Sequence, residues 1–242
     1  MFDKHPKGLI AAALANLGER FGFYTMMAIL VLFLQAKFGM NGKEAGFIYS
    51  TFYFSIYILA LVGGIIADKT RNYKGTIFTG IVLMAVGYLL LAIPSKTPVD
   101  NKMLYLVITC ASLFVIAFGN GLFKGNLQAL VGQMYDNPQY ANMRDSGFSL
   151  FYMFINIGAI FAPFAAVGVR NWWLSTFGYN YDADLPALCH GQLAGTLSPE
   201  ATETYHTLVT KASTAPVQDY TAFASDYLNV FTTGFHYAFG VA

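Results

Sequence analysis

The sequence predicts an all-α integral membrane protein, and composition and segment length are the observations that predict it. Its 242 residues are 56% hydrophobic, 17% aromatic and only 11% charged, whereas soluble domains carry about 25% charged residues. A helix of about 20 residues crosses the hydrocarbon core of a bilayer. Five apolar runs with few or no charged residues reach that length: residues 8–36, 45–67, 75–95, 103–123 and 146–169. The fourth run is expected to continue as a helix to about Tyr135.

The chain divides into three predicted segments. Residues 1–169 hold the five membrane helices, and residues 170–233 form a mainly helical extramembrane insert that is rich in Ser, Thr, Asp and Pro. Residues 234–242 begin a sixth membrane helix. Because the apolar run of this last segment is too short to span a bilayer, we expect the sequence to end within the sixth helix.

Two helices are expected inside the insert. Ser198 is a favoured N-cap residue and Pro199 suits the first helical position, so a helix is predicted from there to about Ala212. A second helix is expected over residues 217–231.

The basic residues predict the orientation in the membrane. The N-terminal residues have no signal-peptide cleavage site, so the first helix is expected to remain in the membrane. With the N-terminus inside, six Lys and Arg residues flank cytoplasmic helix ends and four flank outer ends, which favours a cytoplasmic N-terminus. We expect a multi-pass protein of the cell (inner or plasma) membrane with its insert on the extracellular or periplasmic side. No disulfide is expected between Cys110 and Cys189.

Two charged residues interrupt the first apolar run. Glu19 and Arg20 are adjacent within it, where each charged side chain would cost roughly 2.5–3.5 kcal/mol to insert. Such a pair is expected to face the protein interior or a water-filled path, so it marks a candidate functional site. A buried ion pair that only joins helices is the structural alternative.

Polar residues recur at helical spacing on four of the five helices. Residues three, four or seven positions apart lie on one face of a helix. The stripes are Asn16, Arg20 and Tyr24 on the first helix, Tyr49, Tyr53 and Tyr57 on the second, Asn120, Lys124 and Gln128 on the fourth, and Ser149, Tyr152 and Asn156 on the fifth. A single tyrosine stripe would be explained by packing, but four stripes with three ionisable groups predict an aqueous cavity.

The charges of this cavity predict an anionic ligand. Glu19, Arg20 and Lys124 sum to one positive charge when all are ionised, and arginine and lysine both bind carboxylates. The alternative is that Lys124 is deprotonated or extends to the membrane surface. The net charge of +1 gives no indication of nucleic acid binding. The sequence has no spacing typical of a catalytic nucleophile, a carboxylate pair or a metal site, so we expect no enzyme, cofactor or metal.

Several segments match the motifs of a known family. Glu19-Arg20-Phe21 with Tyr24 matches a first-helix motif E-x-x-E-R-F-x-Y-Y, and residues 119–126 match a fourth-helix motif G-N-G-x-F-K-P-N. Residues 148–160 fit a fifth-helix signature, residues 64–69 a gating loop, and residues 235–240 the start of a sixth helix. The chain thus resembles the proton-dependent oligopeptide transporters of the major facilitator superfamily over about residues 14–166 and 234–242.

The resemblance implies the N-terminal six-helix half of that fold and the transport of di- and tripeptides by alternating access. It implies that Arg20 and Lys124 bind the peptide carboxylate and that Glu19 belongs to the proton-coupling site. The implied substrate-binding residues are Arg20, Tyr24, Tyr57, Asn120, Lys124 and Asn156, and the implied gating residues are Asp68, Lys69 and Arg71. The implied partners are small peptides, protons, the lipid bilayer and the missing C-terminal half, which would complete the cavity.

Two departures from the family pattern leave alternatives open. Asn16 replaces the family's first glutamate and cannot carry a proton, so proton coupling through this helix is expected to be lost or moved. The chain supplies about one half of the fold, and we expect a longer protein represented in part rather than a second polypeptide that completes it. The alternatives are a carrier for another small anionic solute and a non-transporting sensory or structural membrane protein.

Overall fold

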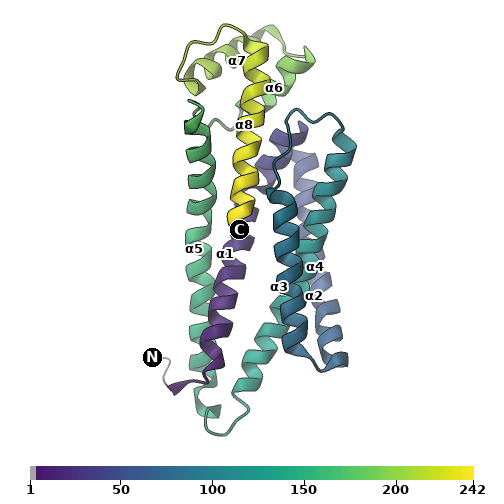
Figure 1. The fold of residues 1–242 in the computed structure, drawn as a ribbon, viewed down its shortest axis with the longest axis vertical. Coiled ribbons are helices and arrows are strands. Elements are labelled where there is room, and N and C mark those ends of the chain that lie inside the picture. The colour runs from purple at the N-terminus through teal and green to yellow at the C-terminus, as the bar shows by residue number, and fades with distance from the viewer. Residues whose placement is uncertain (1–3) are drawn as a thin grey trace.

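A computed structural model describes residues 4–242 as a bundle of long helices with a small helical cap at one end (Figure 1). The helices are α1 (Gly8–Phe38), α2 (Gly42–Thr70), α3 (Tyr73–Ala92), α4 (Lys102–Met134), α5 (Arg144–Thr176), α6 (Leu185–Ala194), α7 (Pro199–Ala212) and α8 (Tyr220–Val241). A short 3-10 turn, Ala141–Met143, precedes α5. The predicted all-α fold is therefore confirmed.

Five helices, α1 to α5, are long and apolar enough to cross a membrane. They lie where the five apolar runs predicted them, and α4 continues to Met134 as expected. The start of α2 shows how capping extends a helix beyond its apolar run. The side chain of Asn41 accepts hydrogen bonds from the backbone amides of Lys43 and Glu44, while the Glu44 carboxylate accepts one from the Asn41 amide. These contacts satisfy amides that have no partner within the helix.

The helices of the bundle form two groups, which meet where α1 contacts α4 and α2 and where α3 contacts α8. In Figure 1, α5, α1 and α8 lie on one side and α2, α3 and α4 on the other. α1 packs against α5, α8 and α4, whereas α2 and α3 both pack on α4. The backbones of α2 and α4 are in close contact, because a Cβ atom added to Gly63 would lie 2.3 Å from the carbonyl oxygen of Gly121. Small residues allow such close contact between membrane helices.

The insert joins the end of α5 to α8 and covers one end of the bundle, here called the insert end (Figure 1). The predicted helix over 199–212 is confirmed as α7, and Ser198 caps it by accepting a hydrogen bond of 3.2 Å from the amide of Ala201. The sequence did not predict α6. Its start is organised by the Asp182 carboxylate, which accepts hydrogen bonds from the amides of Asp184 and Leu185.

One continuous helix, α8, replaces the two that the sequence predicted. We expected a helix over 217–231 and a separate start near Phe235, but α8 runs from Tyr220 to Val241 without a break. The intervening threonines lie within the helix, where the Thr232 and Thr233 hydroxyls donate to the carbonyls of Leu228 and Asn229. Helix α5 likewise continues to Thr176, beyond the predicted boundary at 169.

His190 holds the insert against the membrane bundle. Its Nε2 lies 2.8 Å from the carbonyl oxygen of Ala36, near the end of α1. A carbonyl only accepts, so the imidazole donates through Nε2. Burial lowers the pKa of His190.

The contact between Gly63 and Gly121 predicts that Gly63→Ala destabilises the protein. The added methyl group would overlap the α4 backbone and cost about 1–3 kcal/mol, so we expect a lower unfolding temperature in detergent. Gly64→Ala is the matched control, because a Cβ atom there has no atom within 4 Å. Equal unfolding temperatures for the two variants would contradict this packing.

The lowered pKa of His190 leads to the prediction that the insert contributes more stability at pH 8 than at pH 5. The pKa of His190 is lower in the folded state than in the unfolded chain, so protons favour unfolding as pH falls below the ordinary histidine value. We expect the wild-type protein to have a higher unfolding temperature than His190→Gln at pH 8 and to lose part of that advantage at pH 5. An advantage that stays constant or grows toward pH 5 would refute this assignment.

Candidate functional site

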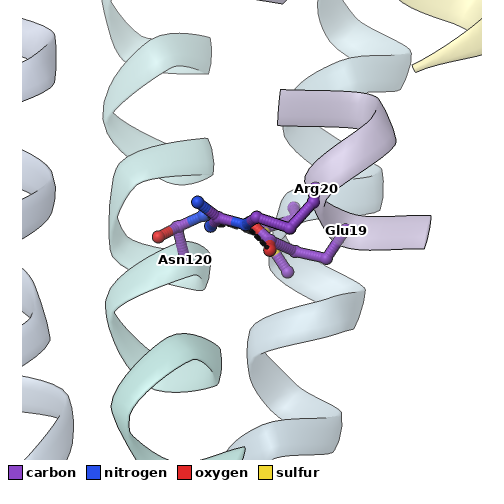
Figure 2. A network of polar contacts seen from close by, with 4 residues as sticks. Glu19, Arg20 and Asn120 are labelled. Atoms are coloured by element: carbon purple, nitrogen blue, oxygen red, sulfur yellow. Dashed lines mark hydrogen bonds and ion pairs between the residues drawn. The ribbon is translucent and has the colours of Figure 1, made fainter. Parts of the chain in front are cut away.

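The charged pair of the first helix is buried and forms a three-residue contact. Arg20 donates from Nε to Glu19 Oε2 and from Nη2 to Glu19 Oε1, both at 2.5 Å. Asn120 of α4 donates from Nδ2 to the same Glu19 Oε1. Figure 2 shows the two α1 side chains directed toward α4, where Asn120 meets them. The side chains of Arg20 and Glu19 are only 7% and 4% exposed. The buried carboxylate thus accepts three hydrogen bonds, two from Arg20 and one from Asn120.

A cavity of about 290 Å³ lies beside this pair, between α1, α2 and α4. Its lining residues are Arg20, Phe23, Tyr24, Met27, Tyr49, Tyr53, Ile56, Tyr57, Asn120 and Lys124. The structure therefore brings together residues that are up to 104 positions apart in the sequence, Arg20 and Lys124 among them. Five of the six residues that the resemblance implied for substrate binding share this one cavity.

Aromatic side chains surround the two basic groups. Lys124 Nζ lies 5.4 Å from the centre of the Tyr57 ring, and Arg20 Cζ lies 6.0 Å from that of Tyr24. The hydroxyls of Tyr57 and Tyr53 are 3.0 Å apart. Tyr53 belongs to the predicted polar stripe of the second helix but is not among the predicted binding residues. Its spacing of four from Tyr57 places both side chains on one helix face.

Asn156 does not line this cavity. Its side chain is exposed on α5, and none of the lining residues comes from that helix. The fifth-helix stripe is therefore separate from the other three. The cause is the packing of α5 on α1, where a Cβ atom added to Gly158 would lie 2.6 Å from the carbonyl oxygen of Leu17.

Asn16 lies one helical turn before Arg20 and is 5% exposed. Its Nδ2 group is buried and has no hydrogen-bond partner among residues 4–242. The Oδ1 atom of Asn120 is also buried and without a partner in that range. Unpaired amide groups of this kind are costly to bury, so the polar region around Glu19 has hydrogen-bonding groups that no other residue in the described range satisfies.

The three residues that the sequence assigned to gating lie together at the turn between α2 and α3. Asp68, Lys69 and Arg71 are exposed there and do not line the cavity. The Tyr73 hydroxyl donates a hydrogen bond to the Asp68 carboxylate. Arg71 ends α2 in the left-handed conformation, with φ of 53°. In Figure 1 this turn is at the end of the bundle opposite the insert.

The cavity is suited to bind an anion. Arg20 already has an acidic partner in Glu19, whereas among residues 4–242 the ammonium group of Lys124 has no ion pair and lies near the Tyr57 ring. An entering carboxylate would balance the charge of Lys124, and the tyrosine hydroxyls and amides would serve the polar groups of a larger ligand.

Comparison with known proteins gives consistent relatives. Residues 74–189 match the PTR2 profile, which describes the POT family. The peptide transporter YePEPT of Yersinia enterocolitica is 34% identical over 185 residues, which are 74% of this chain and 34% of the relative. Dipeptide and tripeptide permease A of Enterobacter sp. (strain 638) is 34% identical over 179 residues, which are 73% of this chain and 32% of the relative.

Solved structures agree with these relatives. A peptide transporter POT in complex with sulfate is 28% identical, with a TM-score of 0.61, over 87% of this chain and 45% of the solved one. Tetrameric PepTSo2 is 26% identical, with a TM-score of 0.62, over 96% of this chain and 49% of the solved one. The chain thus spans about a third of the curated relatives and slightly less than half of the solved transporters. It belongs to the POT family and has about half of the major facilitator fold of these transporters.

Proposed function

We propose that this chain forms the N-terminal half of a transporter that moves di- and tripeptides across a cell membrane by alternating access. The observation that carries the proposal is that two basic residues, Arg20 and Lys124, line one cavity. Glu19 is paired with Arg20 there. Two relatives, a peptide transporter and a dipeptide and tripeptide permease, support the substrate class. The second half of the fold would supply the opposite wall of the cavity.

In this proposal, different residues of the cavity bind different parts of the peptide. The peptide carboxylate binds Lys124 and the outer edge of the Arg20 guanidinium, while Tyr24, Tyr57 and Asn120 bind its polar backbone. Asn156 is exposed on α5 and would reach the substrate where the second half of the fold completes the cavity. Asp68, Lys69 and Arg71 would form and break contacts with the second half as the two halves rock. The N-terminus would be cytoplasmic and the insert outside.

We further propose that the first helix does not couple transport to protons. Glu19 accepts hydrogen bonds from both Arg20 and Asn120, so its carboxylate serves to hold these two side chains. Asn16, where the family has a glutamate, has no group that titrates. Helix one therefore provides a counter-ion for Arg20 but no proton carrier.

Lys124→Ala tests the carboxylate contact in the complete transporter. Loss of a charged hydrogen bond is worth about 10- to 100-fold in binding, so we expect a dipeptide to bind that much more weakly. The carboxamide of the same dipeptide has no charge for Lys124 and should change little. Gln128→Ala, one turn further along α4 and outside the cavity lining, is the matched control. Equal losses for the dipeptide and its carboxamide would rule out the contact.

Asn16→Glu tests the proposal on coupling. We expect uptake of labelled dialanine into liposomes by the wild-type transporter to depend little on an inward proton gradient. Restoring a carboxylate one turn before Arg20 places a titratable group beside Glu19, where like charge raises its proton affinity, so Asn16→Glu should gain gradient dependence. Asn16→Gln controls for side-chain size. Strong gradient-driven accumulation by the wild type that Glu19→Gln abolishes would refute the proposal, and no peptide uptake under any condition would refute peptide transport itself.

A further inference from the structure

A pocket with two lysines, here called the lysine pocket, lies at the insert end of the bundle, where α2 and α4 begin (Figure 1). Its volume is about 520 Å³. The residues that line it are Met40, Lys43, Glu44, Phe47, Ile48 and Lys102. Both lysine side chains are exposed, and among residues 4–242 neither of the recorded ion pairs involves them. Both ammonium groups are thus accessible to a ligand.

Glu44 is the acid of the lysine pocket, and it is held at the start of α2. Its Oε2 accepts a hydrogen bond of 3.0 Å from the amide of Asn41, the residue that caps the helix. With Lys43, Lys102 and Glu44 ionised, the pocket has a net charge of +1. The positive ends of two helix dipoles add to this potential, because α2 and α4 both begin here. One monoanion therefore balances the charge of the pocket.

An apolar groove continues from the lysine pocket along the bundle. It lies between α2 and α4, has a volume of about 290 Å³ and shares Phe47 and Ile48 with the pocket. Its other lining residues are Thr51, Phe52, Ser55, Cys110, Leu113 and Phe114. Phe47 and Phe114 are 73% and 57% exposed. A positively charged pocket and an apolar groove thus form one continuous surface.

The groove is separate from the substrate cavity. In the described part of the chain, no residue lines both. On α2, Ile48, Thr51 and Ser55 share one face, because they are three, four and seven positions apart. Tyr49 and Tyr53 of the cavity lie on the nearly opposite face at 3.6 residues per turn. Because α2 and α4 are long and apolar enough to cross a membrane, a molecule in the groove lies at the depth of the lipid chains.

The length of the groove matches one leaflet of a bilayer. Lys102 and Phe114 are 12 positions apart on α4, and Lys43 and Ser55 are 12 positions apart on α2. At 1.5 Å per residue this distance is about 18 Å. Each leaflet contributes roughly 15 Å to the hydrocarbon core. A ligand with its charge at the lysines and its apolar part in the groove therefore has the dimensions of a membrane lipid.

We propose that the lysine pocket and the groove together bind one anionic phospholipid with a phosphodiester headgroup, such as phosphatidylglycerol. The phosphate oxygens accept hydrogen bonds from Lys43 and Lys102, and one acyl chain lies along the groove from Phe47 to Phe114. The single charge of the phosphodiester balances the net charge of the pocket. Phosphatidylcholine carries its own cation, which the two ammonium groups repel. The leaflet on the insert side of the membrane supplies the lipid.

Native mass spectrometry of the delipidated, complete transporter, titrated with phosphatidylglycerol, tests the proposal. Each lysine near a lipid headgroup contributes about fivefold in affinity. We therefore expect Lys43→Gln and Lys102→Gln each to weaken the binding of one phosphatidylglycerol about fivefold. Lys96→Gln is the matched control, because Lys96 is an exposed lysine at the same end that lines neither the pocket nor the groove, and it should bind as the wild type does.

Cys110→Trp tests the position of the acyl chain. Cys110 is exposed and lines the groove, so a larger side chain there excludes part of the chain. Removing two methylene groups from their contacts costs about tenfold in affinity, and we expect phosphatidylglycerol binding to weaken by that factor. Ala111→Trp is the control, because Ala111 is exposed on the same helix and does not line the groove.

Competing ligands identify the source of the phosphate. Glycerol 3-phosphate, which has no acyl chain, should not displace phosphatidylglycerol, and phosphatidylcholine should bind at least fivefold more weakly. Displacement by glycerol 3-phosphate at equal concentration, or equal binding of the two lipids, would overturn the proposal. Phosphatidylglycerol binding that the lysine variants or Cys110→Trp leave unchanged would also overturn it, as would no lipid binding, the result expected if the second half of the fold covers the groove. The assay does not depend on peptide uptake, so its failure leaves the proposed transport function unaffected.

Discussion

The contact between Glu19, Arg20 and Asn120 is the interaction on which the rest of the structure depends. A charge pair within an apolar bundle is stable only when each partner is present, because removal of one leaves a buried charge that costs about 3–5 kcal/mol. Asn120 connects this pair to α4, so the same contact joins the two groups of helices. It also sets the orientation of the Arg20 guanidinium at the edge of the cavity. One set of hydrogen bonds therefore both joins the helices and orients a residue of the binding cavity.

The cavity is maintained by close backbone contact elsewhere. The small residues Gly63 and Gly121 bring α2 and α4 together, and the Asn126 side chain strengthens this contact by donating a 3.0 Å hydrogen bond to the Gly63 carbonyl. The helices that meet here carry Tyr57 and Lys124, whose ring and ammonium group lie close together. The position of these polar cavity residues thus relies on glycines, which have no polar side chain and allow the helix backbones to pack closely.

The two ends of the bundle compensate buried cations in different ways. Arg20 has a carboxylate partner in the chain, while Lys37 has two carbonyls and a hydroxyl. Neutral oxygens satisfy the hydrogen bonds of an ammonium group but not its charge. The two buried cations therefore differ in their partners: a carboxylate neutralises Arg20, whereas neutral oxygens bind Lys37.

Local sequence information determined the helices and the character of the site. The length of the apolar runs located the five membrane helices, and the capping residue Ser198 located the start of α7, because both signals act within a few residues. The adjacent charges of Glu19 and Arg20 marked the site, since they cannot face lipid. The motif resemblance and helical spacing together selected five residues that line the cavity.

Only the tertiary structure decided which faces meet. Asn156 has the spacing of a cavity residue, but the packing of Gly158 on α1 leaves its side chain outside. The last two predicted helices form one continuous helix, α8, which packs against α1, α3, α5 and α6. Lys37 and His236, which are 199 positions apart in the sequence, line one cavity. Side-chain periodicity specifies a face within one helix, whereas the partner of that face is set by packing between helices that are distant in the sequence.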